Sequence, residues 1–303
     1  MDKPAGCSSF AVVRRVRRLL GIKKVGHAGT LDPFATGLLV VCAGREATRN
    51  VDAFMKGRKQ YAARLQLGVE TNTQDPEGLV TRTRPVEGVD ASAIRTCLDR
   101  MIGEHMQVPP PFSALKHKGK PLYHYARQGI IITKPARPVS IYALAADSYV
   151  AATCQLDITV TCSHGTYIRV LAADIGESLG CGAHLVGLRR TASGPFQVDE
   201  ALDGRLLFEK DNVHAARALY SVRLNVEDAL ARLSHGLVNS PCLNSVKCGI
   251  QAQTALPSRP SETDENRPCI QTPERLRETA SLVAEGQQEV LHGADNREEK
   301  RNY

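Results

Sequence analysis

The segment from Cys154 to Leu179 constrains the fold more than any other part of the chain. Over residues 154–162, CQLDITVTC, apolar and polar side chains alternate, which is the pattern of a strand with one buried face. Gly165 ends this pattern. Apolar residues then return at the spacing of one helix face, at Ile168, Leu171, Ala172, Ile175 and Leu179. A strand that leads directly into an amphipathic helix requires a fold in which helices pack on a sheet.

Further strands and helices follow one another in no regular order. Alternation over residues 60–67 predicts a second strand. Three segments have helical periodicity: 11–20, 90–101 and 121–128. Polar residues over 71–78 predict a turn, and the prolines of 108–112 predict a loop. Because these elements do not repeat as βαβ units, we expect an α+β fold with a central, largely antiparallel mixed sheet flanked by helices.

Aromatic residues divide the chain into two parts. No Phe, Tyr or Trp occurs between Ser221 and Asn302. A segment that cannot bury such side chains does not offset the entropy that ordering costs. We therefore expect a globular unit over residues 1–208, a short closing helical segment over 209–236 and a polar, disordered tail over 237–303.

Basic residues are concentrated at the start of the chain. Residues 1–60 contain 12 Lys and Arg against 4 Asp and Glu, whereas the whole chain has a net charge of +7. This surplus favours a polyanionic partner such as a nucleic acid, although a solvated basic helix around residues 14–18 would give the same count.

Cysteine and histidine spacing argues against disulfides and metals. The nine cysteines are scattered, with no Cys-x-x-Cys pair and no Cys/His cluster at zinc spacing. No apolar run reaches the roughly 18 residues that a membrane span needs, and MDKPAG does not resemble a signal peptide. We therefore expect a cytoplasmic protein with reduced thiols, no metal and no membrane association.

A single carboxylate lies within KKVGHAGTLDPFATGL, residues 23–38. Asp32 precedes Pro33, and this pair is typical of a helix N-cap, which would begin a helix over residues 34–39. The glycines before it permit close approach by another chain, and the lysines suit a partner that carries phosphates. From the residues alone, Asp32 is either a cap or a reactive group.

Arg169 is the second candidate. It falls near the start of the helix predicted after Gly165, where a positive charge opposes the helix dipole. Such a cation is held there by a carboxylate from elsewhere, or it is a surface arginine whose stem covers apolar atoms. Tyr61 and Tyr167 lie at the boundaries of predicted elements. An aromatic residue at such a position either packs in the core or takes part in function.

Five blocks of the chain extend this interpretation. They are DKPAGCSS at 2–9, GHAGTLDPFATGLLVV at 26–41, KQYAARLQLG at 59–68, PPPFSALKHKGKPLYHYARQG at 109–129 and CSHGTYIRVLAADIGESLGCGAHLVGLRR at 162–190. In this order they closely resemble the motifs of the TruB family of tRNA pseudouridine synthases. The resemblance extends from residue 2 to about residue 200.

The resemblance implies an isomerase that converts one uridine of the tRNA T loop, at position 55, to pseudouridine after flipping the nucleotide out. It implies no cofactor and no metal. Residues 1–208 would be the catalytic domain, with an insertion at about 105–130 that grips the RNA. No C-terminal RNA-binding module is recognisable in 237–303. The expected partner is the T stem-loop of tRNA, and we expect a monomer without a protein partner.

Individual roles follow from the same resemblance. Asp32 matches the nucleophile, which either forms an adduct at C1′ or assists a route through a glycal. Arg169 matches the arginine that pairs with this aspartate, and Tyr61 matches a stacking partner and candidate general base. The remaining matches concern RNA binding: Tyr167 and Leu188 in the uracil pocket, His27 in the space that the flipped base leaves, Lys116 and Lys118 in the insertion, and Arg49 near the RNA backbone.

Two other functions share this scaffold. One is a non-catalytic protein that binds or folds tRNA, and the presence of Asp32, Tyr61 and Arg169 together argues against it. The other is the catalytic subunit of a guide-RNA-dependent pseudouridylation complex, which normally depends on the C-terminal module that is not recognisable here.

Overall fold

The computed structural model describes residues 1–238, so the tail expected over 237–303 lies outside the described residues except at its start. The helices are α1 (Ser9–Leu20), α2 (Arg45–Arg49), α3 (Val51–Met55), α4 (Ala91–Arg100), α5 (Leu122–Ala126), α6 (Ile168–Ser178), the 3₁₀ helix η1 (Gly204–Phe208), α7 (Asn212–Ser221) and α8 (Val226–Val238). The strands are β1 (Asp2–Lys3), β2 (Val25–His27), β3 (Thr36–Leu38), β4 (Val41–Ala43), β5 (Lys59–Leu67), β6 (Val69–Thr71), β7 (Val80–Thr83), β8 (Gly103–Gln107), β9 (Lys116–His117), β10 (Lys120–Pro121), β11 (Arg137–Val150), β12 (Gln155–Cys162), β13 (Ala183–Ser193) and β14 (Phe196–Gln197).

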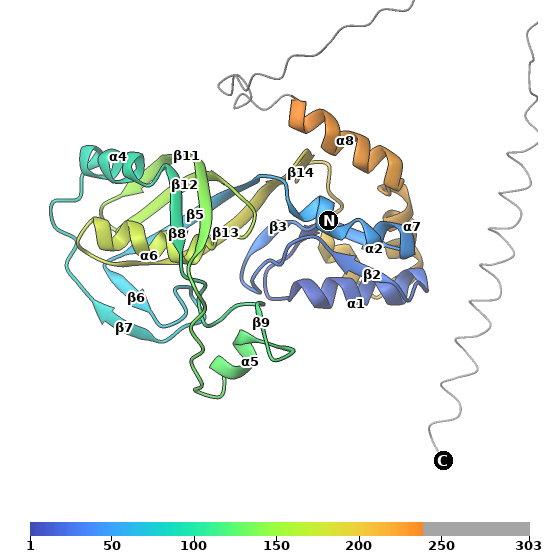
Figure 1. Cartoon of the computed structure of the whole chain (residues 1–303), viewed down its shortest axis with the longest axis horizontal. Helices are drawn as coiled ribbons and strands as arrows, with labels where there is room; N and C mark the ends of the chain where they lie inside the picture. Colours follow the sequence, from blue (N-terminus) through green and yellow to red (C-terminus); the bar gives the residue numbers. More distant parts are fainter. Residues whose placement is uncertain (239–303) are drawn as a thin grey trace, which may run out of the picture. The chain divides into compact units, whose positions relative to one another are not determined.

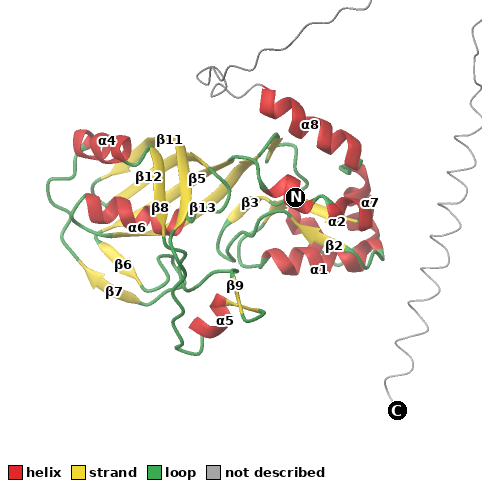
Figure 2. Ribbon diagram, viewed as in Figure 1, coloured by secondary structure: helices red, strands yellow, loops and turns green. Residues whose placement is uncertain are grey.

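A central sheet of eight strands organises the chain (Figures 1 and 2). Its order is β1-β3-β13-β5-β12-β11-β8, and β14 pairs with β13. The pair β3–β13 is parallel, and the other pairs of this sheet are antiparallel. The expected α+β fold with a largely antiparallel mixed sheet is therefore confirmed.

The main core lies where α6 and α4 pack on the sheet. Alternate residues of β5 and β12 are buried, as the period-two pattern predicts. α6 packs on β13 and β5, and α4 packs on β11 and α6. Leu171 and Ile175 of α6 join Leu65, Ile158 and Leu185 of the sheet in one cluster. This core holds α6 against the sheet.

A second core lies beneath the segment that contains Asp32. Val12, Val13 and Val16 of α1 pack with Val25 of β2 and Leu39. β2 pairs with β4, and β3 pairs with both β1 and β13. The segment 27–41 is therefore attached at both ends to packed elements.

The segment 108–136 leaves the sheet after β8 and returns at β11. It contains the hairpin β9–β10 and the short helix α5, which stand on loops away from the main sheet (Figure 2). This placement agrees with an insertion, although its predicted role in gripping RNA stays a prediction.

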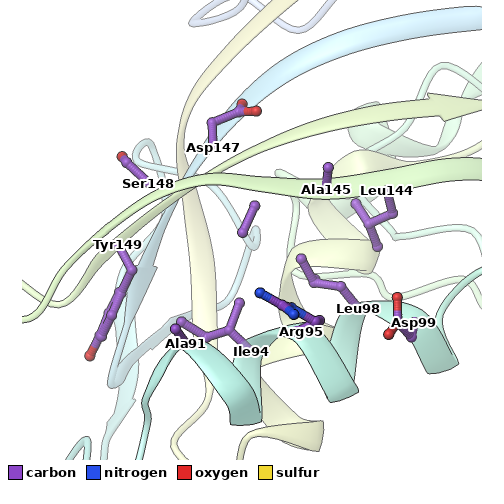
Figure 3. Close-up of a pocket in the computed structure, with 11 residues that line it drawn as sticks. Ala91, Ile94, Arg95, Leu98, Asp99, Leu144, Ala145, Asp147, Ser148 and Tyr149 are labelled. Atoms are coloured by element: carbon purple, nitrogen blue, oxygen red, sulfur yellow. The ribbon is translucent and has the colours of Figure 1, made fainter.

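A pocket of ≈ 430 Å³ remains between α4 and β11 (Figure 3). Arg95 and Asp99 of the helix line it opposite Asp147, Ser148 and Tyr149 of the strand. None of the candidate site residues lines this pocket, so the candidate chemistry has to be sought elsewhere.

Two features of the described residues bear on the expected partners. No helix within residues 1–238 combines the length and the apolar character that crossing a membrane would require. In the same part of the chain, no group of three or more His, Cys, Asp and Glu side chains could hold a metal ion.

Candidate active site

Asp32 lies in a tight turn between β2 and β3, where the amide of Ala35 donates to its carbonyl at 3.2 Å. The predicted N-cap and helix over 34–39 are wrong, because the chain enters β3 instead. Gly37 in β3 has φ of 101°, and a Cβ added there would lie 2.3 Å from the carbonyl oxygen of Arg190. The chain therefore pairs closely with β13 instead of forming a helix, and the Asp32 carboxylate does not cap a helix N-terminus.

The structure brings Asp32 and Arg169 together as an ion pair. Nε of Arg169 lies 2.9 Å from Oδ2 of Asp32, and Nη2 donates to Oδ1 at 3.3 Å. The Arg169 side chain is 3% exposed and that of Asp32 is 32% exposed. The arginine is thus a buried support, whereas the carboxylate remains reachable from solvent.

Arg169 has three further partners, which come from two other segments. Its Nη1 donates to the carbonyl of Thr73 at 2.9 Å and lies 3.4 Å from Oδ2 of Asp75, and its Nη2 donates to the carbonyl of Phe112 at 2.6 Å. The guanidinium therefore has one orientation, which explains a cation in the first turn of α6.

Asp75 is a site residue that sequence reasoning missed. It lies in the predicted turn over 71–78, where a carboxylate is expected in solvent, but it is 6% exposed. The Thr73 hydroxyl and the Glu77 amide both donate to its Oδ1. The Thr-x-Thr-x-Asp spacing of residues 71–75 was the available signal, because short polar side chains in turns often bond local backbone and side-chain groups.

Burial raises the pKa of the Asp32 carboxyl above its ordinary value, and the nearby Asp75 carboxylate adds to this rise. Arg169 opposes both effects through its charge and its hydrogen bonds. The fraction of ionised Asp32 near neutral pH therefore depends on Arg169.

Arg190 of β13 holds the Asp32 segment from both sides. This side chain is 1% exposed, its Nε donates to the carbonyl of Leu38 at 2.7 Å, and its Nη2 donates to that of Gly29 at 3.1 Å. Sequence reasoning gave this arginine no role, since its burial depends on a strand that was not predicted.

Lys3 and Ser9 fix the middle of the same segment. Nζ of Lys3, which is fully buried, donates to the carbonyl of Pro33 at 3.2 Å and to two further carbonyls near the start of the chain. The Ser9 hydroxyl accepts from the Leu31 amide at 2.9 Å and donates to the Leu31 carbonyl at 3.0 Å. Asp32 is therefore flanked by anchored residues, which limits its motion.

The two candidate tyrosines come from different elements. Tyr61 lies on β5 opposite Val160 and Arg190, is 8% exposed, and belongs to the same cluster as Leu31. Tyr167 is half-buried and is the N-cap residue of α6, two positions before Arg169. Burial raises the pKa of both phenols, so both are protonated at neutral pH.

The other five candidates lie on β13, β2, α2 and the β9–β10 hairpin. Leu188 of β13 is partly buried against the main cluster. His27 of β2 is half-buried, and burial together with Arg190 lowers its pKa, which favours the neutral ring. Arg49, Lys116 and Lys118 are exposed on α2 and the β9–β10 hairpin. Within the described residues, none of these five forms a hydrogen bond or an ion pair with Asp32.

Comparison with protein families gives two adjacent matches. Residues 17–168 match the model described as TruB family pseudouridylate synthase (N terminal domain). Residues 169–232 match the model described as tRNA pseudouridylate synthase B C-terminal domain. The first match contains Asp32 and Tyr61, and the second begins at Arg169.

Curated relatives and one solved structure agree with these matches. The chain is 58% identical over 205 residues to tRNA pseudouridine synthase B of Desulfotalea psychrophila, covering 67% of this chain and 83% of the relative. It is 50% identical over 219 residues to the protein of the same name from Burkholderia pseudomallei, covering 70% of each. A crystal structure of a Cbf5–Nop10–Gar1 complex is similar at 30% identity with a TM-score of 0.52, covering 71% of this chain and 57% of that chain. The chain thus spans little more than half the length of that structural neighbour.

Proposed function

Since the chain belongs to the TruB family of pseudouridylate synthases, we propose that it converts uridine 55 in the T loop of tRNA to pseudouridine. The family and the named relatives make the protein an isomerase of the tRNA pseudouridine synthase type. What we propose beyond this is the position in tRNA, the route of the reaction and the roles of individual residues.

The main support for this proposal is one observation. The Asp32 carboxylate, which solvent can reach, is held by two nitrogen atoms of the buried Arg169 guanidinium. A nucleophile has to be ionised and oriented, and it needs one face open to its target. The Asp32–Arg169 pair meets these three conditions. Arg169 favours the ionised form, the bidentate contact fixes the orientation, and the exposed part of Asp32 leaves access to a sugar.

The reaction is an exchange of bonds within one nucleotide. The N1–C1′ bond breaks, the uracil turns, and C5 bonds to C1′. A proton leaves C5 and N1 gains one, so no atom is gained or lost. In our proposal the Asp32 carboxylate attacks C1′ and is released when C5 bonds there.

The target nucleotide has to leave the T loop before Asp32 can reach its sugar. Flipping a base out of its stack costs a few kcal/mol. Stacking on an aromatic ring returns about 1–3 kcal/mol per base, and Tyr61 is the aromatic residue that we assign to this role. Because its phenol is protonated at neutral pH, it has to pass that proton on before it could accept one from C5.

The proposed partner is the T stem-loop of tRNA, bound by a single copy of the chain. Exposed Arg49, Lys116 and Lys118 would contact phosphates, while Tyr167 and Leu188 would line the uracil pocket and His27 would fill the vacated space. A guide-RNA-dependent activity is less well supported, since identity to the Cbf5 complex is 30% and identity to the tRNA enzyme of Desulfotalea psychrophila is 58%.

The test is to map pseudouridine in unmodified tRNA and in a minimal T stem-loop after incubation with the purified chain, without guide RNA. We expect pseudouridine at position 55 in both substrates. Asp32→Asn should form none while tRNA affinity stays near that of the wild type. Pseudouridine at a different position would refute the site assignment. Normal product formation by Asp32→Asn would refute the nucleophile, and tRNA binding without product in the wild type would favour a non-catalytic tRNA-binding protein.

A further inference from the structure

Gln107 is the last residue of β8, where the chain leaves the sheet for the 108–136 segment. It pairs with Arg137 in the ladder with β11, and it is 7% exposed. A buried glutamine needs partners for its amide group, since an unpaired buried amide destabilises the fold. The identity of those partners indicates what the residue does.

Both ends of this side-chain amide bond to one residue, Tyr167. The backbone amide of Tyr167 donates to Oε1 of Gln107 at 2.7 Å, and Nε2 of Gln107 donates to the carbonyl of Tyr167 at 3.1 Å. This closed pair of hydrogen bonds has the form of a strand pairing made by a side chain. It fixes the two peptide units on either side of the Tyr167 Cα, one through its N–H group and the other through its carbonyl.

Tyr167 needs such support because of where it lies. It is the N-cap residue of α6, and a tyrosine side chain cannot accept the hydrogen bonds that Ser, Thr, Asp or Asn accept at a helix start. No side-chain cap bond is present at this helix start. Gln107 on β8 instead provides hydrogen bonds that hold the backbone of this N-cap residue in place.

The same segment contacts the site a second time. Five positions after Gln107, the carbonyl of Phe112 accepts from Nη2 of Arg169 at 2.6 Å. Residues 107–112 therefore bond to the helix start at Tyr167 and again at Arg169. A displacement of one contact would strain the other.

Packing alone does not fix this region. A pocket of ≈ 260 Å³, lined by residues 72–74, 108–112 and Val170, lies beside the contact between Phe112 and Arg169. Residues 108–112 have no packed neighbours on the side that faces this hollow, so their hydrogen bonds to α6 contribute more to holding them in place. The Gln107–Tyr167 bonds are therefore placed to set the geometry of the site.

We propose that Gln107 is a positioning residue, whose side-chain amide fixes the backbone of Tyr167 and thereby the orientation in which Arg169 meets Asp32. The proposal rests on the proposed function, because it assigns Gln107 a part in the same reaction. Gln107 does not touch the reacting atoms, and it acts through Tyr167 and Arg169.

Three variants separate positioning from general support. Gln107→Met keeps the length of the side chain and removes both hydrogen bonds. Gln107→Glu keeps an acceptor for the Tyr167 amide and removes the donor to its carbonyl. The matched control is Gln66→Met on β5, whose Nε2 donates to the backbone carbonyl of Thr153 at 2.9 Å and whose side chain forms no hydrogen bond with a candidate site residue.

Steady-state rates on an unmodified tRNA transcript give the first measurement. For Gln107→Met we expect kcat to fall about 10- to 100-fold with KM changed less than about threefold, as misplacement of a catalytic group costs rate rather than binding. Gln107→Glu should lie between this variant and the wild type, and Gln66→Met should keep the wild-type kcat. Hydrogen exchange at the Tyr167 amide should become faster in Gln107→Met and stay slow in Gln66→Met.

The outcomes distinguish the two proposals. If Gln107→Met loses no more kcat than Gln66→Met, or if only its KM rises, the positioning role is refuted. If Gln107→Met does not fold, the same comparison is made with Gln107→Glu, and wild-type kcat in that variant refutes the role. If the wild type forms no pseudouridine in tRNA, the proposed function fails, and the role of Gln107 fails with it.

Discussion

Arg169 and Asp75 form a second ion pair next to the one with Asp32, with Nη1 of Arg169 at 3.4 Å from Oδ2 of Asp75. One buried guanidinium thus stands between two carboxylates, of which Asp75 is buried and Asp32 is accessible. The buried Asp75 helps to hold the cation in place, and the accessible Asp32 is the nucleophile that we propose. A substitution of Asp75 therefore tests the site without changing the proposed nucleophile.

Asp75→Asn should lower kcat roughly tenfold, because Arg169 loses a charged anchor. The acid limb of the pH–rate profile should also move to lower pH, since the Asp75 carboxylate raises the pKa of Asp32 and the variant removes it. The measurement is kcat on tRNA from pH 4, just above the ordinary pKa of 3.8 for this carboxyl, to pH 8. Glu77→Gln removes a charge from the same turn without removing the Asp75 side chain, and it should leave the profile unchanged. An unmoved acid limb in Asp75→Asn would contradict the coupling.

Arg169→Lys should lower kcat by about 100-fold or more, because an ammonium group keeps the charge but cannot make the bidentate contact. The acid limb should move to higher pH, since the arginine opposes the raised pKa of Asp32 and lysine does so less well. Arg64→Lys is the matched control, because Arg64 also contacts a carboxylate through Nε and Nη2, at Asp157, outside the site. Equal losses in both variants would mean that the Asp32 contact has no special role.

Lys59→Met should change how stability depends on pH. Burial lowers the pKa of Lys59 from 10.5 to about 8, so above pH 8 the unfolded chain binds more protons than the folded chain. Stability should therefore rise with pH through this group, by about 1 kcal/mol between pH 7 and pH 9, and the variant should lack this rise. Denaturant unfolding of both proteins measures the difference.

The exposed Lys56→Met serves as the control for Lys59→Met and should keep the wild-type dependence. The comparison stops at pH 9, because the buried thiols of Cys42 and Cys162, with pKa values raised to about 11, oppose the trend above it. A wild-type slope in Lys59→Met would refute the assignment.

Gly37→Ala should destabilise the fold by about 3 kcal/mol or more, from overpacking and an unfavourable backbone angle together. The added methyl would lie 2.3 Å from the Arg190 carbonyl, at φ of 101°. Gly44→Ala separates the two causes, because Gly44 has φ of 91° with no atom within 4 Å of an added Cβ, so it should cost only about 1–2 kcal/mol. Urea unfolding measures both, and equal losses would show that the contact between β3 and β13 is not tight.

Removing the two lysines of the β9–β10 hairpin should weaken tRNA binding in a salt-dependent way. Lys116→Ala and Lys118→Asn should each reduce the slope of log affinity against log salt by about one, as expected for one lost phosphate contact. Asparagine is chosen at 118 because φ there is 47°. Binding to tRNA over a salt series is the measurement, with exposed Arg100→Ala on α4 as the control. An unchanged slope would place the hairpin away from the RNA.

The elements that were predicted from sequence are those whose burial follows a simple period. β12 and α6 have one continuous buried face each, so alternation and helical spacing located them within a few residues. β13 was missed because its pairing shifts register between Leu185 and Gly187, which breaks the alternation. β11 was missed because most of its residues are exposed. The tail lies outside the described residues, and the division into 1–208, 209–236 and 237–303 stays a prediction.

At the site, single residues were harder to interpret than motifs. Asp32 and Arg169 were singled out by an unusual position and by the family motifs. Lys3, Asp75 and Arg190 were not, since charged residues are mostly exposed and their burial is visible only when the partners from distant segments are in place. The helix over 34–39 was wrong for the same reason, as pairing of β3 with β13 overrides the local signal of Asp32-Pro33.

The two hydrogen bonds of Arg190 have a practical consequence for protein engineering. A chimera that receives residues 26–41 from a homologue would receive a loop whose carbonyls at Gly29 and Leu38 both need the guanidinium of Arg190, which lies in a distant strand. The transplant keeps its shape only if the recipient strand brings an equivalent guanidinium, so these two stretches of the gene should be exchanged as one unit.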